Sequence, residues 1–323
     1  WNNRLGVPLS MLGFAGTERY WVLEAGVNRT GEMDELARIL RPDVAVIHNV
    51  GPVHLEGMGS REGVAREKAK LAGAVRPGGL VLASADYPLL SQALPGRADI
   101  SLVRFSCRER SARYTGEYLG QSGDSGLYRL DLDGTELQVA PGLRSAYQLE
   151  NILAAAATAR ELGCGSREIE AGLAGASLPE HRSQMLRLGR WSLVDDCYNA
   201  NPVSVGCALQ SARELAGSGT LIAFLGDMLE LGEEAGEAHR EMGRKAARWG
   251  VEHLLYNGTH IRDVERGFSE AGGRNGPFPV ETEEELRAFC QSLGATEGLV
   301  LLKGSRGCRL ERFLDVLQRE LGE

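Results

Sequence analysis

Short apolar runs that stop at polar residues, each followed by a segment with helical spacing, recur along this 323-residue chain. The runs at 44–47, 80–83, 191–194, 220–225 and 298–302 predict β-strands that alternate with helices of about 10–15 residues. Alternating strands and helices imply βαβ units and a parallel sheet. The sequence therefore predicts an α/β protein. Its length predicts two domains, because single hydrophobic cores rarely grow past about 250–300 residues.

The pattern changes between residues 100 and 142. Short strands expected at 114–118, 127–132 and 136–139 are joined by turns rich in Gly and Asp, which is typical of antiparallel hairpins. We therefore expect a central domain whose parallel sheet carries antiparallel hairpins.

The segment 177–182 is the expected linker between a domain over 1–178 and a Rossmann-like, doubly wound domain over 179–323. Further strands are expected at 20–23, 252–256 and, weakly, 278–280. Helices are expected at 61–75, 149–162, 166–174, 203–216, 234–249, 260–271, 282–293 and 309–321.

Composition excludes several classes of protein. An apolar share of 43% and a charged share of 25% are ordinary for a soluble globular chain. The net charge of −8 argues against a dedicated surface for nucleic acid or anionic membrane, and no apolar run approaches the roughly 18 residues of a membrane span. The six cysteines form no Cys-x-x-Cys pair, so the spacing indicates neither a zinc site nor a disulfide framework. We expect a cytoplasmic monomer.

The stretch 191–206 is the strongest candidate for a ligand site. Its apolar strand stops at Asp195 and Asp196, and Asn201-Pro202 then opens a helix with a capping side chain and proline in the first turn. Open α/β sheets bind ligands at the carboxyl ends of their strands. The alternative is an ordinary loop that uses Asp and Asn only as turn formers.

Lys68 is the most informative residue of the first half. It shares the apolar face of its helix with Val64, Leu71 and Val75, where a buried ammonium is costly unless it is paired, neutralised or modified. The alternative is a lysine that extends to the helix edge.

Glu24 and His54 each follow an expected strand and could together bind a divalent cation such as Mg²⁺. The alternative is a capping glutamate and a loop histidine.

In the second half, Lys303-Gly-Ser305-Arg306 follows a strand and offers backbone N–H groups and cations to an anion. An ordinary glycine turn with solvated basic residues is the alternative. His239 falls in line with apolar helix positions, so it is as readily a buried, hydrogen-bonded histidine as a ligand contact.

Taken together, these stretches resemble successive motifs of the Mur ligases. The resemblance runs from residue 1 to about 315 and is carried by residues 2–9, 23–28, 31–32, 48–56, 62–65 with Lys68, 195–202, 225–232 and 303–306. Tyr-Asn-Ala-Asn-Pro at 198–202 and Gly-Asp-Met-Leu-Glu-Leu-Gly at 226–232 are similar to the branch that adds D-alanyl-D-alanine to UDP-N-acetylmuramoyl-tripeptide.

The resemblance implies an ATP-dependent amide ligase of peptidoglycan precursor synthesis that works through an acyl phosphate and uses Mg²⁺. Glu24 and His54 match positions that bind Mg²⁺, and Lys68 matches a lysine that is carbamylated and helps to hold a second Mg²⁺. His54 and Lys68 are the implied catalytic residues. Contacts to the nucleotide are implied for Asn151, Arg182, Asp196 and Asn199, and contacts on the side of the incoming dipeptide for Asn201, Lys303, Ser305 and Arg306. Asn199 is also placed to line the dipeptide side.

Three features depart from the family pattern. The phosphate loop Gly-x-x-Gly-Lys-Thr/Ser and the UDP-binding domain do not occur in this chain, so we expect a fragment that is inactive without them. Tyr147 and Lys70 stand where the family usually has His and Glu. Two alternatives remain: a sister ligase with a different acceptor, similar to folylpolyglutamate synthetase, and a non-catalytic fragment that only binds ligand.

Overall fold

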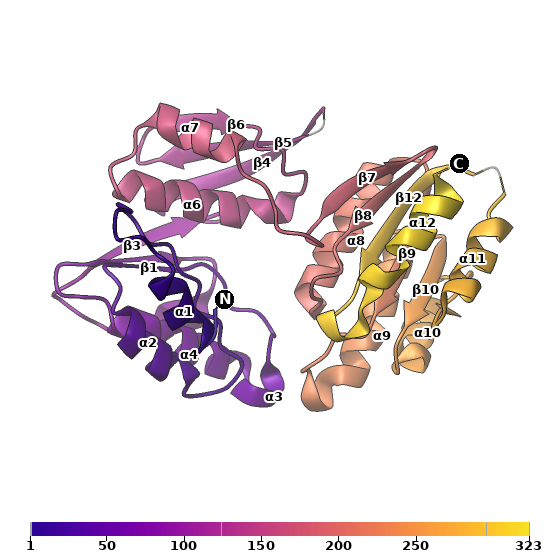
Figure 1. Ribbon diagram of the computed structural model, residues 1–323, viewed down its shortest axis with the longest axis horizontal. Coiled ribbons are helices and arrows are strands. Elements are labelled where there is room, and N and C mark those ends of the chain that lie inside the picture. The colour runs from indigo at the N-terminus through magenta and orange to yellow at the C-terminus, as the bar shows by residue number, and fades with distance from the viewer. Residues whose placement is uncertain (1, 124, 295, 323) are drawn as a thin grey trace. The chain divides into compact units, whose positions relative to one another are not determined.

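In the computed structural model, which describes residues 2–123, 125–294 and 296–322, the chain divides into two compact units. The N-terminal unit ends at Ser177 and the C-terminal unit begins at Leu178. Each unit has a six-stranded sheet of its own, and helices pack on it (Figure 1). Among the described residues, no helix is both long and apolar enough to span a bilayer.

The sheet of the N-terminal unit has the strand order β1-β2-β3-β4-β5-β6. The strands are β1 (Val44–Ile47), β2 (Leu80–Ser84), β3 (Ser101–Ser106), β4 (Tyr114–Ser122), β5 (Ser125–Leu132) and β6 (Glu136–Val139). The pairs from β1 to β4 are parallel, whereas β4, β5 and β6 pair antiparallel. The prediction of a parallel sheet with appended hairpins is therefore confirmed.

The helices of this unit pack on both faces of its sheet. They are α1 (Gly6–Leu12), α2 (Glu32–Leu40), α3 (Leu55–Met58), α4 (Arg61–Gly73), α5 (Pro88–Ala93), α6 (Leu149–Glu161) and α7 (Ser166–Ala174). Because side chains alternate along a strand, Val81 and Ala83 of β2 face the core under α2 and α4, while Leu82 faces the core under α6 and α7. Figure 1 shows α4 and α6 on opposite sides of these strands.

The sheet of the C-terminal unit has the order β11-β10-β9-β12-β8-β7. The strands are β7 (Gln184–Leu188), β8 (Trp191–Asp195), β9 (Thr220–Gly226), β10 (His253–Asn257), β11 (Phe278–Pro279) and β12 (Gly298–Lys303). All neighbouring pairs are parallel except β7 with β8. The expected doubly wound domain is therefore present, with an antiparallel edge strand added to it.

Two cores lie on the two faces of this second sheet. The helices are α8 (Pro202–Ala216), α9 (Ala235–Arg248), α10 (Ile261–Glu270), α11 (Glu283–Ser292) and α12 (Leu314–Leu321). Leu221 and Ala223 of β9 pack in the core with α8, α9 and α10, whereas Ile222 and Phe224 pack in the core with α11 and α12. This alternation follows from the two-residue period of a strand.

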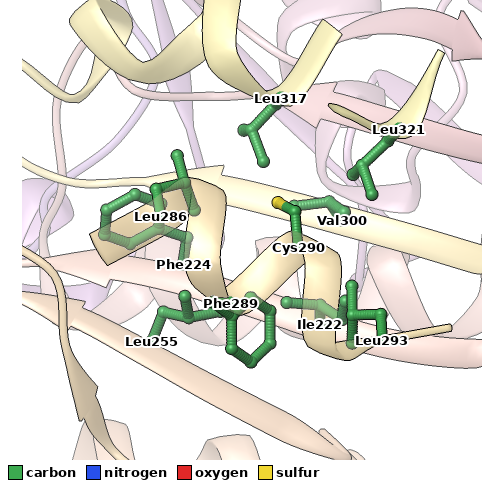
Figure 2. A pocket seen from close by; sticks show the side chains of 10 residues that line it. All are labelled: Ile222, Phe224, Leu255, Leu286, Phe289, Cys290, Leu293, Val300, Leu317 and Leu321. Carbon is green, nitrogen blue, oxygen red and sulfur yellow. The ribbon is translucent and has the colours of Figure 1, made fainter. Parts of the chain in front are cut away.

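A small cavity remains in the core between α11, α12 and the sheet (Figure 2). The residues that line it are apolar or cysteine: Ile222, Phe224, Leu255, Leu286, Phe289, Cys290, Leu293, Val300, Leu317 and Leu321. A water molecule needs several polar partners to be held in such a space. The cavity is therefore a packing gap and offers no polar group to orient a ligand.

Some expected elements are wrong. Residues 20–23 form no strand, because Val22 is 90% exposed and the ring of Trp21 stacks on Phe14 instead of packing on a sheet. Consequently Glu24 does not follow a strand. The expected helix 309–321 begins only at Leu314, since Arg309 has a left-handed backbone (φ 51°) that no α-helix continues through.

Candidate active site

Lys68 lies on α4 with its side chain directed into the N-terminal unit. Its Nζ donates to the backbone oxygen of Asn49 at 2.9 Å and to Asn49 Oδ1 at 3.1 Å. Burial lowers the pKa of Lys68, and the negative charge of Glu150 opposes that shift. The lysine does not extend to the helix edge; its amine is held by the loop that follows β1.

His48 lies in the same loop and was not singled out from the sequence. Its Nδ1 is 3.0 Å from Asn49 Nδ2, which makes Nδ1 the acceptor. Burial, followed by the charge of Lys68, lowers the pKa of His48 to about 4, while the carboxylate of Glu24 acts in the opposite direction. His48 is therefore a neutral imidazole between a cation and an anion. Its place at the end of the strand 44–47 is the signal that could have identified it.

Glu24 and His54 lie in loops of the N-terminal unit. The carboxylate of Glu24 is exposed and accepts a hydrogen bond from Asn2 Nδ2 at 2.9 Å. His54 is half-buried, has a left-handed backbone (φ 54°), and precedes α3. A Cβ on Gly57 of α3 would lie 2.1 Å from the Asn28 oxygen, so glycine allows this short helix to sit against the 28–30 loop.

Glu150 is a further residue that sequence reasoning missed. It lies in the first turn of α6, and its Oε2 accepts a hydrogen bond from Tyr87 at 3.0 Å. Its Oε1 is buried and has no hydrogen-bond partner among the described residues. Burial raises the pKa of Glu150 to about 7. We refer to Glu24, His48, Asn49, Lys68 and Glu150 as the Lys68 cluster.

Asn151 and Tyr147 also lie at the start of α6. Asn151 is exposed and donates to Gln148 Oε1 at 3.1 Å, and Tyr147 is half-buried. Asn151 therefore presents an amide at the surface, as a nucleotide contact would require.

Lys70, the third departure from the family pattern, stabilises α2. Its Nζ lies 2.7 Å from Asp34 and 2.8 Å from Glu67, and Glu67 is buried. Glu67 accepts hydrogen bonds from the backbone N–H groups of Gly31 and Met33 at the start of α2. Lys70 neutralises this capping carboxylate, so the lysine has a structural role of its own.

In the C-terminal unit, Asp195 and Asp196 make different contacts, as consecutive residues at a strand end do. Asp195 is buried against His181 and Cys197. Asp196 accepts from Lys303 at 2.6 Å and from the backbone N–H of Ser183 at 3.1 Å. We call residues 195–202, which begin with these carboxylates, the Asp196 loop.

Lys303 and Ser305 are buried, and both donate hydrogen bonds to residues of this loop. Besides Asp196 Oδ2, Lys303 Nζ donates to the backbone oxygen of Asn199 at 3.1 Å. Ser305 Oγ accepts from Leu229 N at 3.0 Å and donates to the Ala200 oxygen at 3.4 Å. Both residues hold loops together in this structure, and their direct contact with substrate stays a prediction.

Asn201 caps α8, as its place before Pro202 predicts. Its Oδ1 accepts from the N–H groups of Val203 at 3.1 Å and Ser204 at 2.8 Å. Asn199, by contrast, is exposed.

Two guanidinium groups lie over the exposed ring of Tyr198. Arg182 is 4.1 Å and Arg306 5.5 Å from the ring centroid. Both arginines are exposed, and a planar guanidinium can bind a carboxylate or phosphate with two parallel hydrogen bonds. Arg182, Tyr198 and Arg306 therefore form a cationic surface suited to an anionic ligand.

The side chain of Asp227 anchors the motif at 226–232 by hydrogen bonds with Tyr256 and with the segment that follows β10. Asp227 is buried and accepts from Tyr256 and from Thr259. His239 is also buried; its Nε2 accepts from Met228 N at 2.9 Å, and its Nδ1 lies 2.7 Å from the Ala235 oxygen. His239 is thus the hydrogen-bonded core histidine that the sequence left as one of two alternatives.

Comparison with known proteins places both units. Residues 1–159 match the model of the Mur ligase middle domain, and residues 181–306 match that of the Mur ligase, glutamate ligase domain. The chain is 31% identical, over 99% of its length and 67% of the relative's, to the UDP-N-acetylmuramoyl-tripeptide–D-alanyl-D-alanine ligase of Treponema pallidum.

Solved structures agree. The crystal structure of MurF from Acinetobacter baumannii superimposes with a TM-score of 0.88 at 25% identity, covering 98% of this chain and 69% of that one. The MurF ligase of Thermotoga maritima in complex with ADP gives a TM-score of 0.84 at 24% identity, covering 99% and 72%. At 24% identity, the likeness to the Thermotoga maritima structure is evidence for the fold alone.

Proposed function

Because the chain belongs to the Mur ligase family, we propose that its protein joins D-alanyl-D-alanine to UDP-N-acetylmuramoyl-tripeptide with consumption of ATP. The likeness extends over nearly the whole chain to ligases named for this reaction. The structural observation that carries the proposal is the Lys68 cluster. It holds a half-buried amine, a neutral imidazole and carboxylates beside the end of a parallel strand.

The reaction has two steps. The γ-phosphoryl group of ATP passes to a carboxylate oxygen of the tripeptide, which yields an acyl phosphate and ADP. The amine nitrogen of the dipeptide then attacks the acyl carbon, phosphate leaves with that oxygen, and the nitrogen loses a proton to form the amide. Both steps develop negative charge on phosphate oxygens, which fixed cations and hydrogen-bond donors stabilise.

Lys68 is proposed to carry a carbamate. Burial lowers its pKa, which increases the fraction of neutral amine that can attack the carbon of CO₂ with loss of one proton. The modification would turn a buried cation into an anion. It would also remove the need for the amine to donate to both oxygens of Asn49.

Glu24, His54 and the modified Lys68 are proposed to hold Mg²⁺. Carboxylate oxygens are the ligands that Mg²⁺ prefers, and the neutral state of neighbouring His48 avoids an added positive charge. Bound Mg²⁺ would supply positive charge to the phosphate oxygens. Glu24 would supply a carboxylate and the modified Lys68 a carbamate for that purpose.

Roles at the nucleotide and at the dipeptide are proposed from exposure. Asn151, Arg182 and Asn199 are exposed and are proposed to contact the nucleotide, with Asp196 positioned by Lys303. Arg306 is proposed to bind the carboxylate of the dipeptide, because its guanidinium is the exposed cation of the 303–306 motif. Asn201, Lys303 and Ser305 then act as positioning residues for the loop.

The test is turnover by the full-length protein. We expect ADP release that requires both UDP-N-acetylmuramoyl-tripeptide and D-alanyl-D-alanine, with the pentapeptide product identified by mass spectrometry. A folate acceptor with glutamate serves as the control for a sister ligase. Turnover with that pair alone, or no turnover with any muramoyl acceptor, would overturn the proposal.

A further inference from the structure

A second group of side chains in the C-terminal unit has the composition of a metal site. Within residues 2–123, 125–294 and 296–322, one set of three His, Cys, Asp or Glu side chains brings its ligand atoms within 4.8 Å of one another: His181, Asp195 and Cys197. Spacing gave no hint of it, because the cysteines form no Cys-x-x-Cys pair and the histidine precedes β7. The fold brings the three together.

Asp195 lies at the centre of this group. His181 Nδ1 is 2.7 Å from Asp195 Oδ2, and Cys197 Sγ donates to Asp195 Oδ1 at 3.0 Å. Asp195 and Cys197 are buried at the end of β8, and His181 covers them with a side chain that is 24% exposed. Burial, followed by the hydrogen bond to Asp195, raises the pKa of Cys197, so the apo site holds a thiol.

Backbone contacts hold the three residues in place before any ion binds. Tyr198 N donates to the His181 oxygen at 2.9 Å, which ties the segment before β7 to the residue after Cys197. Gln184 pairs with Asp195 in the β7–β8 ladder. His181 has a left-handed backbone (φ 60°), a conformation that non-glycine residues keep only where surrounding contacts impose it.

We propose that His181, Asp195 and Cys197 bind a thiophilic divalent cation of the Zn²⁺ class, at a site separate from the Mg²⁺ of the proposed ligase reaction. One imidazole nitrogen, one carboxylate oxygen and one thiolate are ligands that Zn²⁺ accepts, with water in the fourth position. Sulfur in the set selects against Mg²⁺, which takes oxygen ligands.

The charge of the site suits a divalent ion, and its ligand atoms lie close to one another. A carboxylate and a thiolate carry two negative charges, so a divalent cation leaves the buried site neutral. Metal bonds of about 2.0–2.3 Å place tetrahedral ligand atoms about 3.3–3.8 Å apart. His181 Nδ1 and Cys197 Sγ lie 2.7 Å and 3.0 Å from oxygens of Asp195, so these hydrogen-bonded pairs would have to move slightly apart to admit an ion.

Binding needs deprotonated ligand atoms. The thiol of Cys197 releases its proton to solvent as the S–metal bond forms, and Nδ1 of His181 binds the ion through its lone pair. Metal binding therefore releases protons, and affinity rises with pH.

The experiment is a titration of the intact, chelator-treated protein with Zn²⁺ in excess Mg²⁺ and without ATP or peptide substrates. We expect one Zn²⁺ per chain, release of protons on binding, and a thiolate-to-metal charge-transfer band when Co²⁺ replaces Zn²⁺. Cys197→Ser keeps a donor to Asp195 but removes the thiolate, and His181→Gln removes the imidazole. Each should weaken binding by at least about a hundredfold, since even residues behind metal ligands contribute 10–100-fold.

Cys207→Ser, on α8, is the matched control and should leave binding unchanged. Thermal melts establish that each variant is folded, and His181→Gln provides the test should Cys197→Ser not fold. Absence of stoichiometric Zn²⁺ binding by the unsubstituted protein overturns the proposal, as does unchanged affinity in Cys197→Ser or His181→Gln. Because no ligase substrate is present, failure here leaves the proposed function untouched.

Discussion

The Lys68 cluster and the Asp196 loop both contain buried charged groups, but their charges are satisfied to different degrees. In the Asp196 loop, Asp196 forms a short ion pair with Lys303 of β12, and each of the two has further hydrogen bonds to neighbouring residues. In the Lys68 cluster, the amine is held by the neutral oxygens of Asn49, and Glu150 has one buried oxygen to which no described residue donates a hydrogen bond.

This difference in charge pairing indicates that the two regions have different roles. A fully paired set of charges fixes a loop in one conformation. Separating the two partners would leave each charge without its counter-ion, which is strongly destabilising. An incompletely paired set can change its protonation state or accept a modification, and perturbed pKa values of this kind gather at functional sites. We therefore propose that the Lys68 cluster is the reactive region and that the Asp196 loop is the scaffold for exposed ligand contacts.

The largest expected effect follows from removing the amine. Lys68→Ala should lower kcat by about a thousandfold or more, the scale of losing one preorganised electrostatic group, while the fold is retained. Steady-state ADP release by the full-length enzyme measures it. Arg66→Ala, on the exposed face of the same helix, is the control and should change kcat little. Activity near that of the parent enzyme in Lys68→Ala would place the chemistry elsewhere.

The scaffold role of the Asp196 loop predicts an effect on stability. Lys303→Met leaves Asp196, whose side chain is only 13% exposed, without its cation and should lower the free energy of unfolding by about 3–5 kcal/mol. Urea denaturation followed by circular dichroism measures it. The double variant Asp196→Asn with Lys303→Met should recover part of the loss, because neither partner is then charged. Equal losses in the single and double variants would show that the pair itself contributes little.

The sequence predicts the scaffold better than the chemistry. The bounds of β1 follow from its apolar run, and the Asn201 cap of α8 follows from local turn chemistry. The run at 20–23 has the composition of a strand but lacks the packing of one, since Val22 is almost fully exposed. Local composition cannot reveal whether a neighbouring strand is available to pair with it.

Charged side chains show the same limit. The sequence places Lys68 on an apolar face, but it does not reveal that Glu150, 82 positions later in α6, acts on its pKa. Lys303 looks like an anion-binding cation until the fold pairs it with Asp196. Contacts between residues far apart in sequence decide which charges are available for ligands, and no single-sequence pattern records those contacts.

The buried carboxyl of Glu150 predicts a pH dependence. Its pKa is raised to about 7 in the folded protein from 4.5, so the folded state binds the proton more tightly. The resulting stability is complete below pH 4.5 and is lost as the pH rises through 7, with a slope of at most about 1.4 kcal/mol for each pH unit between the two values. Glu150→Gln should therefore flatten the fall in unfolding free energy over this range of pH. Urea midpoints across the range, with exposed Glu170→Gln as control, test it; an unchanged slope would contradict the assignment.

The smallest expected effect separates a cap from a substrate contact. Asn201→Ala removes the side chain that accepts from Val203 and Ser204 at the start of α8, which should cost about 1 kcal/mol of stability. Asn199→Ala removes an exposed amide and should cost less. In steady-state assays well below the melting temperature, a cap alone leaves the KM for the dipeptide unchanged. A raised KM in Asn201→Ala, larger than that in Asn199→Ala, would instead make Asn201 a direct ligand contact and the loop more than a scaffold.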